Sequence, residues 1–361
     1  MNKPPVLLLY GLDEASQPYE VEATTALVEV AVNALHSRGW RVEAVKLVHD
    51  LVTPLRRYDP REWIVLNLCE GSPAQDFYYA RMARLLDSLD YTYTGSDQHA
   101  LDQTQFKRQM KHVLTDWAVP TPAWAIYDAP NEVDFKVYPA IVKPASEHCS
   151  LGITRQSVVM TLEEARKQVA AVCHEFKGAA LIEEFLDSPE YNVSVWGGDA
   201  SHLGCTGCAT VLGISTMTYD AFSDIHDRLC TFEAKWDPES AAYQRIPAIC
   251  PAPVSAELQA EIERVAIAAY HATGCRDYGR VDMRLRGNQP MALDVNSNCD
   301  VSPGSGFANA ATAAGMDYAQ MLEKIVQFAI QRRDAQATPV THKRARAQTE
   351  HAVLTTAPAA A

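Results

Sequence analysis

The stretch RVDMRLRGNQPMALDVN, residues 280–296, decides how this chain is interpreted. Apolar residues alternate along both flanks, which is typical of strands, and the RGNQ between them has the composition of a turn. Side chains two apart on a strand share a face. Arg280 and Asp282 therefore point the same way, and so do Asp294 and Asn296. The stretch predicts a hairpin with four polar side chains on one face.

A turn centred on Asn288 places Asp282 opposite Asp294, with the two β-carbons roughly 5 Å apart. Two carboxylates this close repel each other unless a positive group lies between them. A hard cation bound by carboxylate and amide oxygens would satisfy both. The alternative is a solvated strand face whose acids carry no function. The hairpin alone does not choose between these interpretations.

The composition of the 361-residue chain is that of a globular protein with two or three domains, with 47% hydrophobic and 21% charged residues. Lysine plus arginine number 32 and aspartate plus glutamate 45, and the net charge of −13 argues against non-specific nucleic-acid binding. No apolar run approaches the roughly 20 residues that span a bilayer, and the short apolar start lacks a signal-peptide cleavage site. We expect a cytoplasmic protein with neither a nucleic-acid nor a membrane partner.

Nine cysteines are scattered along the chain, and in the cytosol we expect them to stay reduced. Cys205 and Cys208 form a CxxC, which would suit redox chemistry or half of a zinc site. No second CxxC and no histidine pair stands at zinc spacing. Since the pair lies in a strand-like run, the structural interpretation is favoured.

Composition and periodicity divide the chain into four parts. Strands alternate with helices over residues 1–95, which predicts a parallel sheet with helices on its faces. A second unit at 96–185 opens with a helix expected over 102–117, and a third unit follows at 186–334. Residues 335–361 shift to Ala, Thr, Gln and basic residues and are predicted to be a disordered tail.

A lysine at a strand end opens the stretch KPASEHCSLGI at Lys143. A loop of small residues can surround an anion with backbone N–H groups while the ammonium neutralises its charge, so this pattern suits phosphate binding. A strand-end lysine is more often a surface residue. Lys107 and Lys111 stand one helical turn apart, which by itself indicates only an exposed helix face.

Three acids, Glu183, Glu184 and Glu190, follow one another in LIEEFLDSPEY. Carboxylates at the end of a buried strand accept hydrogen bonds from an amine edge or a ribose hydroxyl, although they could equally be solvated loop acids. Lys235 in TFEAKWD is equally ambiguous alone. No single motif decides the function.

The order of these features resembles the ATP-grasp superfamily, and within it the D-alanine–D-alanine ligase family. The resemblance spans roughly residues 63–330 and is carried by YTYTGSDQHALDQTQFK, YPAIVKPASEHCSLGI, LIEEFLDSPEYNVSV, FEAKW, GRVDMRLRGNQPMALDVNSN and SPGSGFANAATAAG. It implies an α/β (α+β) ATP-grasp fold. An N-terminal parallel α/β pre-ATP-grasp domain at 1–95 would precede two lobes that enclose ATP, a central lobe at 96–185 and a C-terminal lobe at 186–334.

The resemblance also implies an ATP site between the lobes. The phosphates would be held by Lys107 and Lys143, with Ser150 helping from the loop. The adenine and ribose would be bound by residues at the end of the acidic strand, namely Glu183, Glu184 and Leu186 for adenine and Glu190 for ribose.

The polar hairpin would be the metal site. Asp282, Asp294 and Asn296 match the family's magnesium ligands, and two Mg²⁺ ions are expected, with Mn²⁺ as a substitute. Such a pair bridges phosphate oxygens and neutralises charge that develops in phosphoryl transfer. Arg280 matches the arginine that stabilises a tetrahedral oxyanion, and Lys235 matches the lysine that reaches the transferred phosphate.

Substrate positions are matched less closely. Ser305 matches a residue that binds the carboxylate of the amine substrate. The glutamate that anchors the amine of the first D-alanine in the family has only loose counterparts, Glu20 or Glu22. Trp236 stands where the ligases have a tyrosine that pairs with a loop serine, and that serine position is Cys149 here.

Further departures surround the position of the first amino acid. Phe232 replaces a second tyrosine, and the family's His-Gly motif is replaced by the stretch CEGS at 69–72. The second metal carboxylate, usually glutamate, is Asp294, which binds magnesium with a shorter reach. Most ATP and metal positions are therefore kept while most positions around the first amino acid differ. A site built to bind a particular amine loses affinity when its donors and acceptors are removed.

The resemblance implies an ATP-dependent carboxylate–amine ligase that acts on small-molecule acids and amines. It would form an acyl phosphate and ADP, and then an amide and phosphate. Because the pocket differs, we expect an acid substrate other than D-alanine. The alternatives are a housekeeping D-alanine–D-alanine ligase, an ATP-grasp phosphotransferase and a nucleotide-binding protein without turnover. A loop at 215–235 is expected to exclude water from the acyl phosphate, and, as is common in the family, a homodimer is expected.

Overall fold

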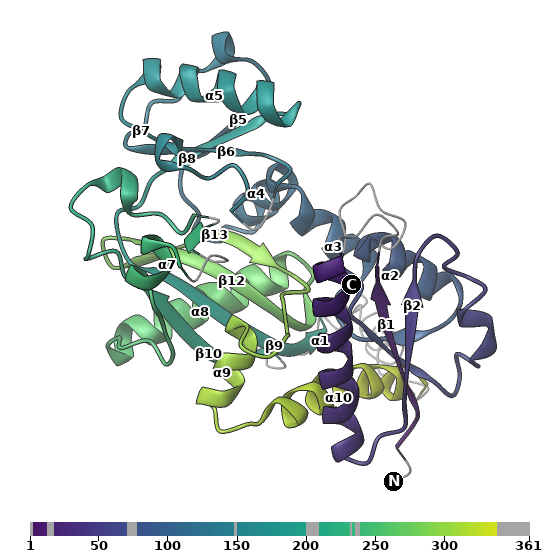
Figure 1. Ribbon diagram of the computed structural model, residues 1–361. Helices are drawn as coiled ribbons and strands as arrows, with labels where there is room; N and C mark the ends of the chain where they lie inside the picture. Colours follow the sequence, from purple (N-terminus) through teal and green to yellow (C-terminus); the bar gives the residue numbers. More distant parts are fainter. Residues whose placement is uncertain are drawn as a thin grey trace, which may run out of the picture.

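The structure is a computed structural model, shown in Figure 1. It describes residues 3–12, 18–70, 78–147, 150–199, 209–231, 233–234 and 239–337, and of residues 18–20, 198–199, 241 and 336–337 it describes the backbone only. In the described ranges no helix is long and apolar enough to cross a membrane.

The N-terminal part forms the predicted parallel sheet, with strand order β2-β1-β3-β4. Its elements are β1 (Val6–Gly11), α1 (Pro18–Ser37), β2 (Val42–Leu47), β3 (Ile64–Asn67), α2 (Tyr79–Ser88) and β4 (Thr92–Tyr93). Because successive side chains of a strand point to opposite faces, Leu7 and Leu9 pack in one core with α2 while Val6 and Leu8 pack in another with α1. Burial on both faces explains the uninterrupted apolar run of β1.

The helix predicted over 102–117 is two helices, α3 (Gln98–Gln105) and α4 (Lys107–Asp116). Phe106 interrupts them with an extended backbone, φ −104° and ψ 113°. The backbone N–H of Lys107 then donates to Ala145 O at 3.2 Å, a bond made across the fold in place of one within a helix. The break changes the direction of the chain, so that α4 starts beside the end of β6.

A small antiparallel sheet follows, with strand order β5-β8-β6-β7 and helix α5 on one face. Its elements are β5 (Trp124–Tyr127), β6 (Ala140–Pro144), β7 (Val158–Val159), α5 (Leu162–Phe176) and β8 (Ala180–Glu184). In Figure 1 this sheet lies apart from the N-terminal sheet, and α4 lies between it and the third sheet.

The third sheet is antiparallel, with strand order β11-β10-β9-β12-β13. Its strands and the helices near them are β9 (Glu190–Asp199), β10 (Ala209–Met217), α7 (Ala241–Arg245), β11 (Ala248–Ile249), α8 (Ala256–Ala272), β12 (Arg276–Arg286), β13 (Gln289–Asn296), α9 (Gly306–Ala313) and α10 (Tyr318–Ala337). Helix α8 covers one face, where Val281 and Met283 are fully buried against Val265 and Ala269. The opposite face of β12 therefore carries its polar residues.

The C-terminal helices return to the N-terminal sheet. Phe307 of α9 and Ile325 of α10 pack in one core with Val6 and Leu8 of β1. In Figure 1, α10 lies beside α1. This core crosses the predicted divisions after residues 95 and 185, which stay predictions. Helix α10 runs to Ala337, into the first residues of the predicted tail, and 338–361 lie outside the described residues.

Candidate functional site

The hairpin forms, and Asp282 stands directly opposite Asp294 as predicted, but the turn is not centred on Asn288. The two-residue turn pairs Arg286 with Gln289, and a regular ladder from that turn would have placed Leu293 opposite Asp282. A bulge between Ala292 and Asp294 inserts one residue and corrects the register. Without it Asp294 would point to the α8 face, because one residue of slip reverses every side chain.

Asp282 is nearly buried, with 8% of its surface exposed, and three side chains donate hydrogen bonds to it. Arg280 makes a bidentate contact, from Nε to Oδ1 at 2.6 Å and from Nη2 to Oδ2 at 2.9 Å. Asn192 of β9 donates to Oδ1 at 2.9 Å and Asn296 donates to Oδ2 at 3.1 Å. These contacts orient Arg280 along the face that also carries Asp294.

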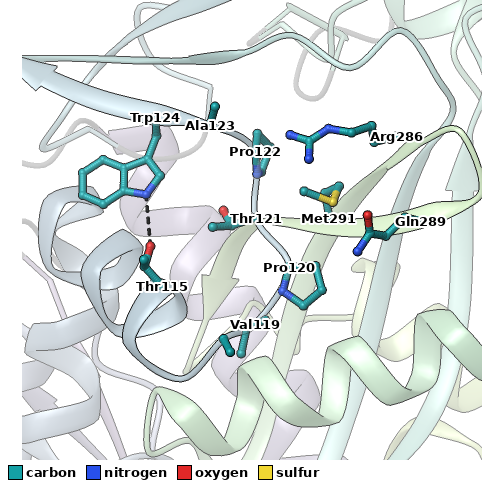
Figure 2. A pocket seen from close by; sticks show the side chains of 11 residues that line it. Thr115, Val119, Pro120, Thr121, Pro122, Ala123, Trp124, Arg286, Gln289 and Met291 are labelled. Carbon is teal, nitrogen blue, oxygen red and sulfur yellow. Dashed lines mark hydrogen bonds between the residues drawn. The ribbon is translucent and has the colours of Figure 1, made fainter. Parts of the chain in front are cut away.

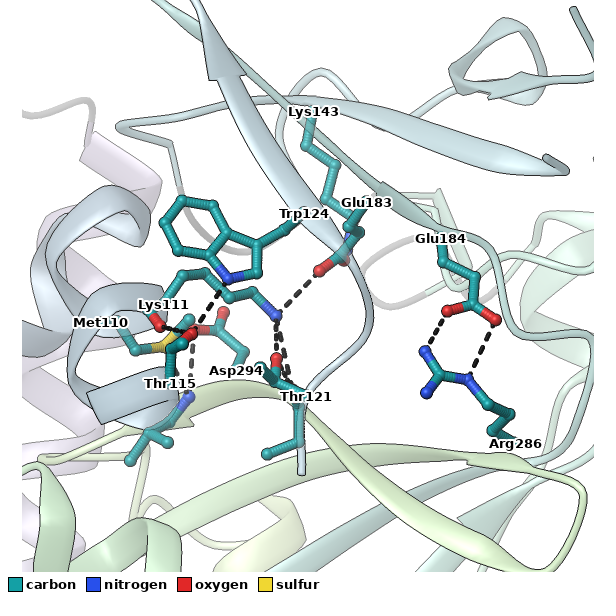
Figure 3. Close-up of polar contacts among 12 residues, drawn as sticks. Met110, Lys111, Thr115, Thr121, Trp124, Lys143, Glu183, Glu184, Arg286 and Asp294 are labelled. Carbon is teal, nitrogen blue, oxygen red and sulfur yellow. Dashed lines mark hydrogen bonds and ion pairs between the residues drawn. The ribbon is translucent and has the colours of Figure 1, made fainter. Parts of the chain in front are cut away.

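A group of lysines lies beside this face, around Glu183 at the end of β8 (Figure 3). Lys111 Nζ, fully buried, lies 2.8 Å from Glu183 Oε2 and donates to Thr121 Oγ1 at 2.9 Å. Lys143 pairs with the other oxygen of the same carboxylate. Lys107 is 7% exposed and donates to the backbone carbonyl of Glu147 in the loop after β6.

Burial and charge act in opposite directions on these groups. Burial alone would raise the pKa of Glu183, but the ammonium groups of Lys111 and Lys143 outweigh it and lower that pKa to about 2. Burial lowers the pKa of Lys107, and the nearby carboxylate of Asp294 partly offsets this. The site therefore concentrates positive charge opposite the acidic hairpin, as binding of a polyanion requires.

The residues predicted to contact adenine and ribose lie together at the end of β8 and the start of β9. Glu184 pairs with Arg286 at the hairpin turn, as Figure 3 shows. Leu186 is buried, and Glu190 Oε2 accepts from Arg284 Nε and from the Tyr219 hydroxyl, each at 3.3 Å. Their roles toward a nucleotide stay predictions.

Ser150 has a left-handed backbone, φ 63°, and its hydroxyl donates to Cys230 O at 2.7 Å. This bond connects the segment 218–231 to the loop after β6. Arg155 adds ion pairs to Asp224 and Asp227 of the same segment. The predicted closing loop at 215–235 begins with the end of β10 at Met217, and the segment 218–231 that follows lies against the central sheet.

The hairpin donors fit a magnesium site. Two carboxylates form one cross-strand pair, and Asn296 uses its Nδ2 toward Asp282, which turns its Oδ1 to the other side. Among the described residues no group of three or more His, Cys, Asp or Glu side chains stands at metal-binding distance. Magnesium is commonly bound through one or two carboxylates with the other ligands from phosphates and water, so a pair with an amide suffices.

Of the remaining predicted residues, Ser305 is described and several others lie outside the described ranges. Ser305 caps α9, where its hydroxyl accepts from the backbone N–H of Ala308 at 3.2 Å. Lys235 and Trp236 lie outside the described residues, as does the side chain of Glu20. Phe232, Cys149, Cys205 and Cys208 lie outside as well.

Sequence reasoning passed over three side chains that complete the site: Lys111, Asn192 and Arg284. Asn192 and Arg284 share their strand faces with residues already singled out, because Glu190-x-Asn192 and Arg280-x-Asp282-x-Arg284 continue the alternation of two. The alternation in the sequence was therefore enough to predict that Asn192 and Arg284 share these faces. Lys111 had no such signal beyond helical spacing from Lys107, since only the fold brings Glu183 to it.

An open groove of about 610 Å³ lies at the linker between α4 and β5 (Figure 2). Its walls include Pro120, Pro122, Trp124 and Met291, together with Arg286, the partner of Glu184. None of the predicted site residues lines it. The groove therefore lies at the linker and borders the turn end of the hairpin, where Arg286 and Met291 lie.

Comparisons with known proteins agree with this geometry. A family described as "D-ala D-ala ligase C-terminus" matches residues 127–327. The chain is 28% identical over 324 residues to the uncharacterized protein y4sG of Sinorhizobium fredii, covering 88% of this chain and 91% of that protein. It is 31% identical over 304 residues to a D-alanine–D-alanine ligase of Alcanivorax borkumensis, covering 84% and 88%.

A solved structure shares the fold. The crystal structure of a D-alanine–D-alanine ligase from Bacillus anthracis complexed with ATP superposes with a TM-score of 0.67 at 18% identity, covering 92% of this chain and 100% of that one. The predicted ATP-grasp fold with a parallel N-terminal α/β part is confirmed, and the structure adds that two antiparallel sheets follow that part.

Proposed function

Since the chain belongs to the D-alanine–D-alanine ligase family of ATP-grasp enzymes, we propose that it joins an amino-acid-type carboxylate to an amine at the expense of ATP. The observation that carries the proposal is the hairpin face. Asp282, Asp294 and Asn296 stand there with Arg280, beside the lysines around Glu183. One face thus combines oxygen donors for a cation with positive groups for phosphates.

The nucleotide would lie between the central sheet and the third sheet. Lys107 and Lys143 neutralise its phosphates, while the ends of β8 and β9 receive the base and ribose. Asp282, Asp294 and Asn296 would hold magnesium, which when bound neutralises charge on the phosphate oxygens. Lys111 keeps the Glu183 carboxylate ionised and in place, which leaves the Lys143 ammonium fixed at the loop.

The reaction has two steps. The substrate carboxylate attacks the γ-phosphorus, and the bond to ADP breaks, which gives an acyl phosphate. The amine nitrogen then attacks the acyl carbon, and phosphate leaves as the amide forms. Arg280, aligned by its bidentate contact with Asp282, is positioned to stabilise the oxyanion of the second step.

The acid substrate is proposed to be other than D-alanine. The family's His-Gly motif is replaced at Cys69, whose thiol is 3% exposed. Burial raises the pKa of that thiol, so it stays neutral and apolar where the family has an imidazole. A neutral thiol cannot replace the hydrogen bonds of histidine, and a changed donor set selects a different substrate.

The test is ADP release by the purified protein with ATP and magnesium, with D-alanine and with pools of other amino acids, and products read by mass spectrometry. We expect ADP release that depends on an acid and an amine, with a product mass equal to their sum less water. D-alanine-dependent release with a D-alanyl-D-alanine mass would refute the substrate proposal and identify a cell-wall ligase. A phosphorylated acceptor without any amide would show a phosphotransferase.

A further inference from the structure

Arg284 is a buried guanidinium in the nucleotide region to which no role has been assigned. It is 4% exposed and stands directly opposite Glu190 in the pairing of β12 with β9. It shares its strand face with Arg280 and Asp282. Burial of a guanidinium is energetically costly unless its N–H groups donate hydrogen bonds, so the contacts of Arg284 indicate its role.

All three nitrogens of Arg284 donate, each to a different segment. Nε donates to Glu190 Oε2 at 3.3 Å, Nη1 to Leu186 O at 3.0 Å, and Nη2 to Arg228 O at 3.0 Å. Leu186 belongs to the predicted adenine pocket, Glu190 to the predicted ribose site and Arg228 to the segment 218–231. One planar group therefore holds three parts of the nucleotide region in a fixed arrangement.

Two aromatic rings enclose this group. The guanidinium carbon lies 4.5 Å from the ring centre of Tyr219 and 5.2 Å from that of Phe185. The Tyr219 hydroxyl donates to Glu190 Oε2 at 3.3 Å. Arg284 and Tyr219 thus act on the same carboxylate oxygen, and neither of these two contacts uses Glu190 Oε1.

Arg284 also reaches the segment that lies over the site. Arg228, whose carbonyl it binds, pairs through its own side chain with Asp187 at 2.8 Å. Leu229 beside it is buried against Phe185. The carboxylate that faces a ribose and the segment that packs over it are therefore connected through the same guanidinium.

We propose that Arg284 is a positioning residue for the nucleotide ribose, which fixes Glu190 so that Oε1 accepts a hydrogen bond from a ribose hydroxyl. The inference rests on the proposed use of ATP. Arg284 does not touch the nucleotide. Its effect is on discrimination between ribose and deoxyribose, because a hydroxyl gains affinity only from an acceptor held at the right place.

The experiment measures dissociation constants for ADP, 2′-deoxy-ADP and 3′-deoxy-ADP with magnesium by isothermal titration calorimetry, which needs no knowledge of the acid or amine. For the unaltered protein we expect at least one deoxynucleotide to bind about tenfold more weakly than ADP, as the loss of a hydrogen bond to a carboxylate implies. In Arg284→Met that ratio should fall close to one, because ADP loses the ribose contact in addition to any affinity that the deoxynucleotide also loses.

Arg264→Met is the control, since it makes the same chemical change on α8, where the arginine is exposed and pairs only with the nearby Glu261 among the ion pairs described. Its ratio should stay that of the unaltered protein. Arg284→Lys should also lose the discrimination, because one ammonium cannot donate along three directions held by a planar fork. Should Arg284→Met fail to fold, Tyr219→Phe removes the second donor to Glu190 Oε2 and should lower the ratio in part.

The outcomes separate the two proposals. If the unaltered protein does not bind ADP, the proposed function fails. If it binds ADP and discriminates against a deoxynucleotide, but Arg284→Met and Arg284→Lys weaken all three ligands equally, Arg284 is only structural and this inference is wrong. If it binds all three equally, the ribose role of Glu190 and the inference both fail while nucleotide binding stands.

Discussion

Replacement of Lys111 by methionine tests the buried ion pair between Lys111 and Glu183. Lys111 is fully buried and Glu183 is 1% exposed, so solvent screening of their interaction is small. Lys111 and Lys143 together lower the pKa of Glu183 from 4.5 to about 2, and a shift of this size corresponds to about 3 kcal/mol. Removal of one partner of a buried pair costs about 3–5 kcal/mol. We expect Lys111→Met to lose about 3 kcal/mol of the free energy of unfolding.

The assay is urea unfolding at pH 7, with Lys167→Met, an exposed lysine on α5, as the control that should change stability by less than about 0.5 kcal/mol. Because the folded-state pKa of Glu183 is depressed, its contribution is present above pH 4.5 and is lost as pH falls toward 2. The difference between the unaltered protein and Lys111→Met should therefore stay constant from pH 7 to about 5 and shrink below it.

A double-mutant cycle with Glu183→Gln identifies the partner. If the interaction is as described, the double variant loses clearly less stability than the sum of the two single losses. A loss from Lys111→Met below about 1 kcal/mol, or single losses that simply add, would refute the reasoning that Lys111 stabilises the fold through Glu183.

Three further predictions concern the polar hairpin face, the turn at Gly95 between β4 and α3, and the segment 218–231. Asp294→Asn should lower ADP release by about a hundredfold or more with an unchanged unfolding midpoint, and near-normal rates would remove the metal assignment. Gly95→Ala should lower the free energy of unfolding by about 1–3 kcal/mol, since Gly95 has φ +87° and an added β-carbon would lie 2.6 Å from Asn298 Oδ1. Gly304→Ala, at φ +83° with nothing within 4 Å, should cost less in the same urea titration, and equal losses would exclude the steric cause. Arg155→Met removes half-exposed ion pairs and should cost at most about 1 kcal/mol in low salt and less in high salt, so a larger, salt-independent loss would contradict it.

Local patterns were enough to predict much of this protein. Alternation of two along 280–296 predicted the hairpin and its polar face, and the strand–helix alternation of the first 95 residues predicted the parallel sheet. Both predictions depend on the direction of side chains within one element, and this direction follows directly from the spacing of residues in the sequence. The family resemblance rested on the order of such stretches, and the comparisons confirm it.

Other features required the whole fold. The predicted single helix over 102–117 breaks at Phe106 because the N–H of Lys107 bonds to Ala145 in the central sheet. Helix propensity contains no information on a partner so far along the chain. The same helix carries Lys111, which by spacing alone resembled an exposed lysine and proved fully buried against Glu183.

The register of the polar hairpin face was also decided by tertiary structure. The turn and the alternation predict a polar face on each strand, but the bulge before Asp294 brings the two faces together. The alternation of residues by itself determined which side chains could act together: Arg280 with Asp282, and Asp294 with Asn296. Packing of α8 brings these side chains together. It buries Val281, Met283 and Val295 on one face of the sheet, so the carboxylates of both strands must point to the other face.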